Sequence, residues 1–579
     1  MRASLTGKYG LAALGMVLMA ADAQPSTVRT APRVNPSFEI GLKPIAEPGG
    51  AIQRVAVTLK LDGLAVDVDQ PLVHIPLITA NVTTSAASIE GLEAHDARGS
   101  LSIASRDEGQ EPSVDRVWRV ARPTTGEIIL RYTVPATAPL ALRGPAPPLE
   151  LRAERGSVSG SASTFVLLPV DSRAFQASVR WDLSALPSGA KAAGSIRAGE
   201  TITLSAQDIG QSYFAAGAIH QFPLAPGKTG FAMVWTGDPP FDAHKIAELA
   251  AILYKRYQRF FHSDLSSPYT IFMRNNAVNP GGGFGQRRAF VLTYGASFPG
   301  NDANFLKVTL AHEMFHTFQP MIAREGDMLH AWNTEGFAVY YGRELPLRYK
   351  MISSADFLDN LNSTAARYYT DKFIHASNQQ AAAHFWTDTR YRMLAYDRGS
   401  FYLTKVDEAL RRQSHGRQTL DDLLMKLSRK AGEAPLVPDD WEKLIFEELG
   451  QEGVDDYHAF LDGALQIPES GAYGPCFRRT SKMLRQFDLG FDPEALTEPG
   501  RVVHGLEHGS EAEKAGLRDG DAIIDPIGQD VLQFKQTSLV NLNVRRGGQR
   551  FTITYLPRGE AVPAYQWERV AGIPEDRCG

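Results

Sequence analysis

The pattern of hydrophobic and polar positions changes twice along this sequence. Over residues 50–220, short runs such as 56–61 mix polar–apolar alternation with β-branched residues, and turn residues separate the runs. This pattern predicts strands. Over 241–465 apolar residues recur mainly at helical spacing, with one strand expected at 269–273 after the first helix. From residue 487 onward, short β-type runs return among many glycines.

The first residues resemble a secretory signal. Arg2 and Lys8 give a positive start, 11–21 is apolar, and Ala21-Asp22-Ala23 has the small-x-small pattern that signal peptidase cuts. The apolar run is shorter than the roughly 20 residues that a membrane-spanning helix needs. We therefore expect a cleavable signal peptide at 1–23 and an exported protein, periplasmic or secreted; an uncleaved anchor is the alternative. No second long apolar run follows, so no membrane span is expected in the mature chain.

Composition narrows the possible functions. The chain of 579 residues has 60 Lys+Arg and 65 Asp+Glu, a formal charge of −5, and 22% charged residues. These values exclude a disordered chain, a collagen-like chain and a strongly basic nucleic-acid binder, so no nucleic-acid partner is expected. Two cysteines, Cys476 and Cys578, are too few for a cysteine-based zinc module. They could pair in an oxidising compartment or remain buried thiols.

The segment 310–318 contains the motif His-Glu-x-x-His. On a helix, His312 and His316 lie four positions apart and project from the same face, so both imidazoles can reach one Zn²⁺. Glu313 lies beside the first histidine, where it can take a proton from the attacking water as general base. The sequence therefore predicts a catalytic zinc site, with one Zn²⁺ per chain.

A catalytic zinc usually has three protein ligands. Glu335 follows His316 after eighteen residues, in the segment 332–341, which is expected to be a second helix. The alternative for a lone Glu is a solvated surface carboxylate. Because Glu335 lies among aromatic and aliphatic residues, a buried carboxylate paired with a metal cation is the better explanation.

These motifs resemble those of a known peptidase family. His-Glu-x-x-His, eighteen residues and Glu is the pattern of gluzincin metallopeptidases, and the wording of 332–341 resembles the glycyl aminopeptidase family within that group. Residues 396–399 resemble the family's Tyr-x-Lys-Gly, and 419–424 resembles its Leu-Asp-Asp segment. The resemblance implies a zinc peptidase of aminopeptidase type that acts on a peptide or protein substrate.

The resemblance also implies a multidomain α+β architecture. Its expected parts are an N-terminal β-sandwich-like domain at 24–230, a thermolysin-like zinc catalytic domain at 231–345, a helical region at 346–480 that completes the active site, and a PDZ domain with a C-terminal tail at 481–579.

Tyr396 is the second candidate catalytic residue. A phenol O–H directed at the former carbonyl oxygen stabilises the transition state more than the bound substrate, because negative charge develops on that oxygen. The alternative for a single Tyr is core packing with a hydrogen-bonded hydroxyl. Arg398, two positions further on, is expected at the surface.

The sequence departs from the family before the zinc helix. The family segment resembles Gly-Gly-Leu-Glu-His, whose Glu can meet the substrate's free amine, but here Gly285 or Gln286 replaces the acid. Arg287 and Arg288 make the local charge less favourable for an amine. The segment can still form an edge strand that pairs with an extended peptide, or it can be a glycine turn. The candidate substrate-binding residues are Gly282, Gly283, Phe284, Gly285 and Gln286.

The C-terminal segment from about 485 to 560 resembles a PDZ domain of bacterial proteases. Residues 509–524 resemble its helix–turn–strand signature, with Gly516 ending the helix, and 551–555 is expected as the closing strand. The candidate binding loop for a peptide C-terminus consists of Leu489, Gly490 and Phe491.

Three functional hypotheses follow. The first is an exported zinc peptidase of aminopeptidase type. The second keeps the chemistry but not the recognition of a free N-terminus, which gives a zinc endopeptidase or another amide hydrolase. The third is a non-catalytic PDZ binding protein. The presence of all three ligand residues, the base and the tyrosine argues against the third.

Overall fold

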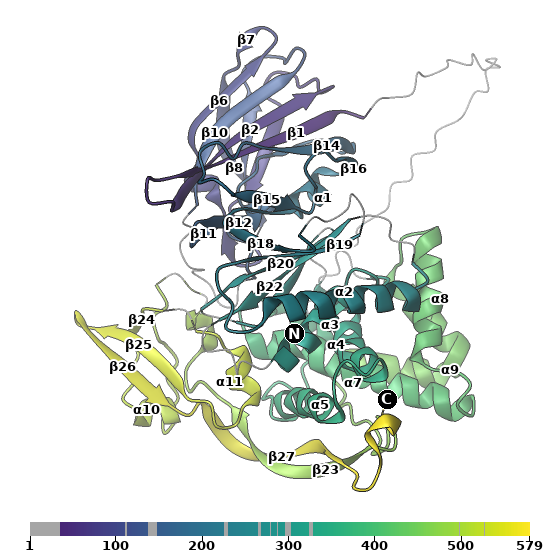
Figure 1. The fold of residues 1–579 in the computed structure, drawn as a ribbon. Coiled ribbons are helices and arrows are strands. Elements are labelled where there is room, and N and C mark those ends of the chain that lie inside the picture. Colours follow the sequence, from purple (N-terminus) through teal and green to yellow (C-terminus); the bar gives the residue numbers. More distant parts are fainter. Residues whose placement is uncertain are drawn as a thin grey trace, which may run out of the picture.

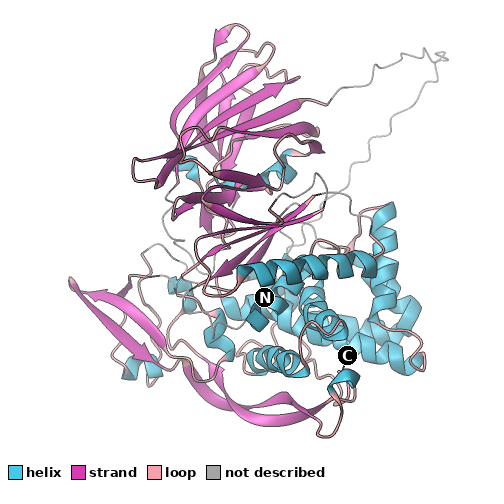
Figure 2. Cartoon of the chain, in the orientation of Figure 1, coloured by secondary structure: helices cyan, strands magenta, loops and turns pink. Residues whose placement is uncertain are grey.

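The computed structural model describes residues 35–110, 113–136, 147–224, 230–263, 268–277, 280–286, 288–295, 303–322, 328–496, 498, 500–525 and 527–578. The expected signal peptide at 1–23 lies outside these residues. The chain has the expected multidomain α+β organisation: a β-rich N-terminal part stands on a largely helical part, and a smaller β-rich module lies beside the helices (Figures 1 and 2). Among the described residues, no helix combines the length and apolarity that a membrane crossing requires.

The N-terminal part is built from three sheets around one apolar core. Alternation in the sequence explains this arrangement: in β1, every second residue from Phe38 is buried. Val57, Val73 and Val158 come from different sheets and belong to the same buried cluster. The seven-stranded sheet has the order β16 (Thr201–Leu204), β14 (Phe175–Trp181), β1 (Ser37–Ala46), β2 (Ile52–Asp62), β10 (Ile128–Pro135), β6 (Glu90–Asp96), β7 (Gly99–Ser100). One four-stranded sheet has the order β13 (Leu168–Pro169), β3 (Pro71–Pro76), β9 (Ser113–Val120), β8 (Ile103–Gln110). The other has the order β11 (Arg152–Glu154), β12 (Ser157–Ser161), β17 (Tyr213–Gly217), β15 (Lys191–Gly194).

A five-stranded sheet connects the N-terminal part to the helices. Its order is β18 (Ile219–Phe222), β19 (Phe231–Thr236), β20 (Tyr269–Asn275), β22 (Ala289–Tyr294) and β21 (Gly283–Gln286). Strands β19, β20 and β22 are parallel, and β21 is an antiparallel edge strand. The glycine-rich segment is therefore a strand, as one of the two interpretations of the sequence expected. Strand β18, which precedes residue 231, belongs to this sheet as well.

The helices follow the predicted periodicity. Helix α2 (Ala243–Phe260) begins at Asp242, whose carboxylate accepts hydrogen bonds from two backbone amides of the first turn. The sheet and the helices share one buried cluster, in which Trp332 packs against Trp441 with ring centroids 5.6 Å apart. The remaining long helices are α3 (Ala303–Phe315), α4 (Ala331–Arg348), α5 (Ser354–Tyr369), α7 (Thr389–Gln413), α8 (Leu420–Glu433) and α9 (Pro438–Leu461), with the short α6 (Asn378–Ala383).

The C-terminal module begins with a long two-stranded ribbon of β23 (Phe477–Phe487) and β27 (Arg558–Arg569). A smaller sheet of β24 (Ala522–Ile523), β25 (Val540–Arg546) and β26 (Gln549–Tyr555) has its own core. Helix α10 (Glu511–Lys514) ends near Gly516, whose φ of 95° is in the left-handed region that the expected cap needs. These elements confirm the predicted helix end and closing strand; the assignment as a PDZ domain stays a prediction.

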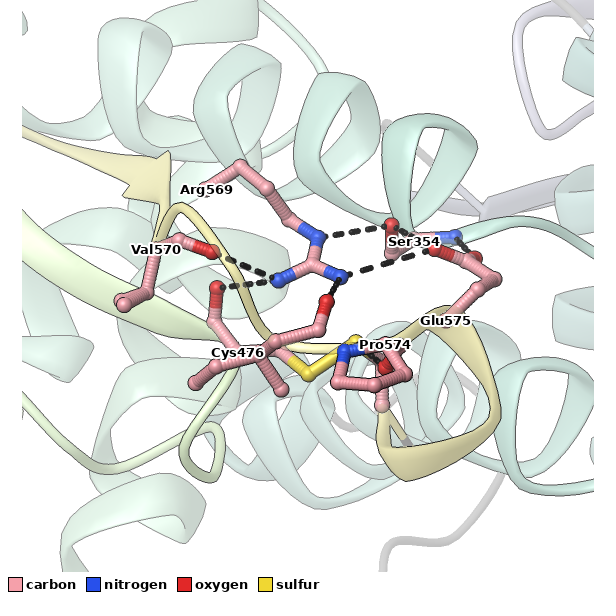
Figure 3. The surroundings of a disulfide bond; sticks show 8 residues. Ser354, Cys476, Arg569, Val570, Pro574 and Glu575 are labelled. Atoms are coloured by element: carbon pink, nitrogen blue, oxygen red, sulfur yellow. Dashed lines mark hydrogen bonds and ion pairs between the residues drawn. A yellow bond between two sulfur atoms is a disulfide. The ribbon is translucent and has the colours of Figure 1, made fainter.

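Cys476 and Cys578 form a disulfide, which settles the question that the sequence left open. The bond ties the chain end to the residue before β23. Arg569 reinforces the same region, because its guanidinium donates to the carbonyl oxygens of Val570 and Ile573 (Figure 3). Glu575 accepts hydrogen bonds from both the amide and the hydroxyl of Ser354, at the start of α5. The C-terminal tail is thus attached to the helical region.

Candidate metal centre and active-site cavity

The three predicted ligands converge at one point. His312 Nε2 lies 3.2 Å from His316 Nε2 and 3.2 Å from Glu335 Oε2, and His316 Nε2 lies 3.5 Å from the same carboxylate oxygen. Ligands held at about 2.0–2.1 Å around a tetrahedral ion lie roughly 3.3–3.4 Å from one another. The spacing of the three atoms therefore matches that of three ligands of one zinc ion.

Burial of the carboxylate also fits a cation. Glu335 Oε2 is enclosed and accepts no hydrogen bond from any described residue. Burial acts to raise the pKa of Glu335, but the neighbouring His316 and His312 lower it overall, so the anionic form is favoured. Among the described residues, these three form the one group of histidine, cysteine or acidic side chains close enough to hold a metal.

Glycines on α4 explain how the ligands meet. A Cβ atom at Gly342 would lie 3.2 Å from the backbone of His312, so α3 packs closely against α4. A Cβ atom at Gly336 would lie 2.8 Å from the carbonyl carbon of Gly399, so the backbones of α7 and α4 are in direct contact at this point. These two contacts hold both the histidine helix and the tyrosine helix close to α4, which carries Glu335.

Glu313 lies between the metal ligands and the edge strand. Its side chain is 7% exposed, and burial raises the pKa of Glu313 above its ordinary value although both histidines act to lower it. A Cβ atom at Gly283 of β21 would lie 2.3–2.4 Å from the Cγ, Cδ and Oε1 atoms of Glu313. Position 283 therefore has no room for a side chain while Glu313 keeps this position.

Tyr396 lies on the histidine side of the site. Its ring stacks on His312, with centroids 6.0 Å apart and planes 11° apart. The sequence suggested a surface position for Arg398, but this residue is buried and only 1% exposed. It donates hydrogen bonds to the carbonyl oxygen of Ala376 and to Asn378 Oδ1, because α7 turns this face toward the segment before α6 and away from solvent.

The sequence gave no reason to single out Gln319. Its Nε2 atom lies 3.0 Å from His316 Nδ1 and donates to the carbonyl oxygen of Thr334, the residue before Glu335. Such contacts orient metal-binding histidines. The signal available in the sequence was its position one turn after His316.

A cavity of about 1720 Å³ opens above these residues. Its walls include the predicted segment from Gly282 to Gln286, the metal ligands with Glu313, and Tyr396, and also residues of the N-terminal part such as His74 and Ser163. The volume exceeds the roughly 300–1,000 Å³ of small-molecule sites. The cavity can therefore hold several residues of an extended chain.

The edge strand presents its backbone to this cavity. Thr293 N donates to the carbonyl oxygen of Gly282, so the alternation of an antiparallel ladder directs the backbone groups of Gly283 and Gly285 to the open edge. Gln286 anchors the strand, because Ser161 of the N-terminal part donates a hydrogen bond to its side chain. A Cβ atom at Gly285 would meet nothing within 4 Å.

The predicted peptide-binding loop lies in the C-terminal module, away from the cavity-lining residues. Leu489 and Phe491 are 2% and 3% exposed. The amide of Gly490 donates to Asp488 Oδ1 at 2.9 Å, and Asp488 Oδ2 pairs with Lys372 of the helical region at 2.6 Å. The Asp488 carboxylate thus already accepts a hydrogen bond from the Gly490 amide, one of the groups predicted to bind the C-terminus of a peptide ligand.

Comparisons with known proteins identify the fold. No protein-family model and no curated protein matches the sequence. A crystal structure of an aminopeptidase N family protein from Idiomarina loihiensis has a TM-score of 0.64 with 15% identity, covering 91% of this chain and 98% of that chain. A variant of an M1 zinc metallopeptidase from Deinococcus radiodurans bound to a Tyr-Ser-Ala substrate covers 75% and 97% of the two chains at 15% identity, but its TM-score of 0.44 is too low to support an argument. The chain thus shares its fold with the aminopeptidase N family protein.

Proposed function

We propose that this protein is a zinc metallopeptidase. The triangle of His312, His316 and Glu335, with the ligand spacing of a tetrahedral zinc ion, is the observation that carries this conclusion. The buried carboxylate of Glu313 beside it and Tyr396, whose ring stacks on His312, support hydrolysis. The fold of the Idiomarina loihiensis protein agrees with this function.

Each residue has a distinct part in the proposed reaction. When bound, zinc would polarise the scissile carbonyl and make water a better nucleophile. Glu313 takes the proton of the attacking water and passes it to the leaving amine, and its burial favours this exchange because the raised pKa brings it closer to neutral pH. Tyr396 donates its hydroxyl proton in a hydrogen bond to the oxygen on which negative charge develops.

The edge strand supports an extended peptide as substrate. The outward amides and carbonyls of Gly283 and Gly285 can pair with a peptide backbone laid along the cavity. This arrangement resembles aminopeptidase action, but position 285 offers no carboxylate to a free amine. A zinc endopeptidase or another amide hydrolase is therefore the second candidate, and the open space at Gly285 is the observation that favours it.

We also propose export, with removal of residues 1–23, and a peptide C-terminus as ligand of the loop formed by Leu489, Gly490 and Phe491. N-terminal sequencing of the protein from the cell envelope and the medium tests the first. Calorimetry with peptides that end in a free or an amidated carboxyl group tests the second, because the free carboxylate has two charged acceptor oxygens for the loop amides and the amide has one neutral oxygen.

Metal analysis tests the central proposal. The purified protein should contain one zinc per chain, and His316→Ala should lose both zinc and peptidase activity. His508→Ala is the control, since His508 is 98% exposed and belongs to the C-terminal module. A full complement of zinc in His316→Ala would overturn the ligand assignment.

Matched peptides distinguish the two candidate specificities. We expect the free N-terminus to matter little, so peptides with free and acetylated N-termini should give similar kcat/KM values. A preference for the free amine on the order of 100-fold, or about 2.7 kcal/mol, would favour the aminopeptidase and require an acidic anchor elsewhere in the cavity.

A further inference from the structure

A second group of polar side chains lines the same cavity, where α2 meets the turn between β21 and β22. Tyr254 is 3% exposed and the side chain of Arg288 is 11% exposed, and both line the cavity. The Tyr254 hydroxyl and Arg288 Nη1 are enclosed, and neither has a hydrogen-bond partner among the described residues. A buried polar group without a partner is unfavourable, because it has lost its hydrogen bonds to water and gained none in return. Two such groups at one cavity wall indicate that a ligand atom completes their hydrogen bonds.

Two guanidinium groups lie near this wall. Arg288 Nη2 pairs with Glu200 Oε1 at 2.8 Å, and the other oxygen of Glu200 accepts from the backbone amide of Arg197. Arg197 and Arg288 both act on Tyr254, where their charges lower its pKa against the larger, opposite effect of burial. An anion beside the Tyr254 hydroxyl would therefore be attracted to both guanidinium groups.

The wall lies on the His316 side of the metal centre. Tyr254 stacks on Tyr269, with ring centroids 5.1 Å apart, and the Tyr269 hydroxyl accepts a hydrogen bond from Thr317 at 2.6 Å. Thr317 directly follows His316, whereas Tyr396 stacks on the other histidine, His312. A peptide that passes the metal centre can therefore direct a side chain toward this wall.

We propose that Tyr254 and Arg288 form a subsite for a carboxylate of the substrate. The carboxylate would accept hydrogen bonds from the Tyr254 hydroxyl and Arg288 Nη1 and would be attracted to the Arg197 and Arg288 guanidinium groups. Two sources of this carboxylate are chemically equivalent: a Glu or Asp side chain near the scissile bond, and the C-terminus of a short peptide. The subsite rests on the proposed peptidase function and adds its substrate class.

Peptides that differ only by Glu or Gln test the subsite. Pairs are made with the substitution at each position around the cleaved bond, and a second series compares C-terminal acids with amides. In wild-type protein, kcat/KM should be higher for the acidic member of one series by on the order of 10-fold, or about 1.4 kcal/mol. The series that shows this difference identifies the source of the carboxylate.

Tyr254→Phe should bring the acidic-to-neutral ratio close to one. Because its hydroxyl is buried without a partner, the change should not lower thermal stability, which separates recognition from folding. Tyr257→Phe on the same helix is the matched control, since the Tyr257 hydroxyl donates to the carbonyl oxygen of Ala311 at 3.0 Å. It should lower stability and leave the ratio as in wild type. Arg288→Gln should also abolish the preference; if it does not fold, Tyr254→Phe decides.

Binding measurements separate this proposal from the peptidase function. Calorimetry on the Glu313→Gln variant compares the same peptide pairs without hydrolysis, and the acidic member should bind more tightly. If wild-type protein hydrolyses Gln and Glu peptides at equal rates, the subsite is overturned and the peptidase function stands. If acidic peptides bind more tightly but wild-type protein hydrolyses none of the peptides, the peptidase function is overturned and the subsite stands. A preference that persists in Tyr254→Phe would also overturn the subsite.

Discussion

Replacing Gly283 with alanine should disable the proposed general base while the metal site remains intact. The added Cβ atom would lie 2.3–2.4 Å from three atoms of the Glu313 side chain. Carbon atoms in contact lie about 3.5–4.0 Å apart, so either the strand or the carboxylate must move by roughly 1 Å or more. A misplacement of that size can reduce the rate on the order of 10²-fold.

The assay combines kinetics, metal analysis and thermal unfolding. In Gly283→Ala we expect kcat to fall on the order of 10²-fold, with zinc retained, because the three atoms nearest the new Cβ all belong to Glu313, which is not a proposed ligand. Gly285→Ala is the matched control for folding and metal content, since a Cβ atom there meets nothing within 4 Å. Wild-type kcat in Gly283→Ala would show that Glu313 is not the base or does not act from this position.

Three further variants test single groups. Glu313→Gln should keep its zinc and lose on the order of 10²–10⁴ in rate, and wild-type activity would remove it as base. Tyr396→Phe should lower kcat on the order of 10²–10³ with little change in KM, and wild-type kcat would place the oxyanion partner elsewhere. Burial raises the pKa of Asp371 to about 7 from 3.8, so its stabilising contribution is complete below about pH 4 and is lost as the pH rises to about 7. Asp371→Asn should flatten the dependence of the melting temperature on pH between about 4 and 7, and an unchanged slope would contradict the assignment. The charged groups that act on Asp371 are Arg390, Asp388 and Asp397.

The candidate metal ligands could be singled out in the sequence because the geometry of the histidine pair is local. A spacing of four residues on one helix places His312 and His316 on the same face whatever surrounds the helix. Glu335 could also be singled out from the sequence, because a carboxylate buried within an apolar helix needs a cation. The strand and helix patterns likewise follow from periods of two and 3.6 residues, which are properties of the backbone.

The close contacts that the glycines allow could not be predicted from the sequence. Gly283 looks the same as Gly285 in the sequence, yet one abuts Glu313 and the other faces open space. Gly336 lies within the predicted helix at 332–341 and Gly342 directly follows it, and nothing in the sequence indicated their close contacts with α7 and α3. Such contacts depend on distances between segments far apart in the chain, and residue order does not specify these distances.

The environment of the charged groups was also decided by tertiary structure. Arg398 was expected in solvent, but the segment before α6 covers it and accepts its hydrogen bonds. Tyr254 and Arg288 carry no motif, and they meet because a helix and a hairpin turn pack at one wall of the cavity. The sequence by itself determined which residues can hold a metal and which elements carry them, because both depend on local backbone geometry. Only the tertiary structure decided which groups face the cavity, because burial and charge pairing are set by whatever the fold places beside each side chain.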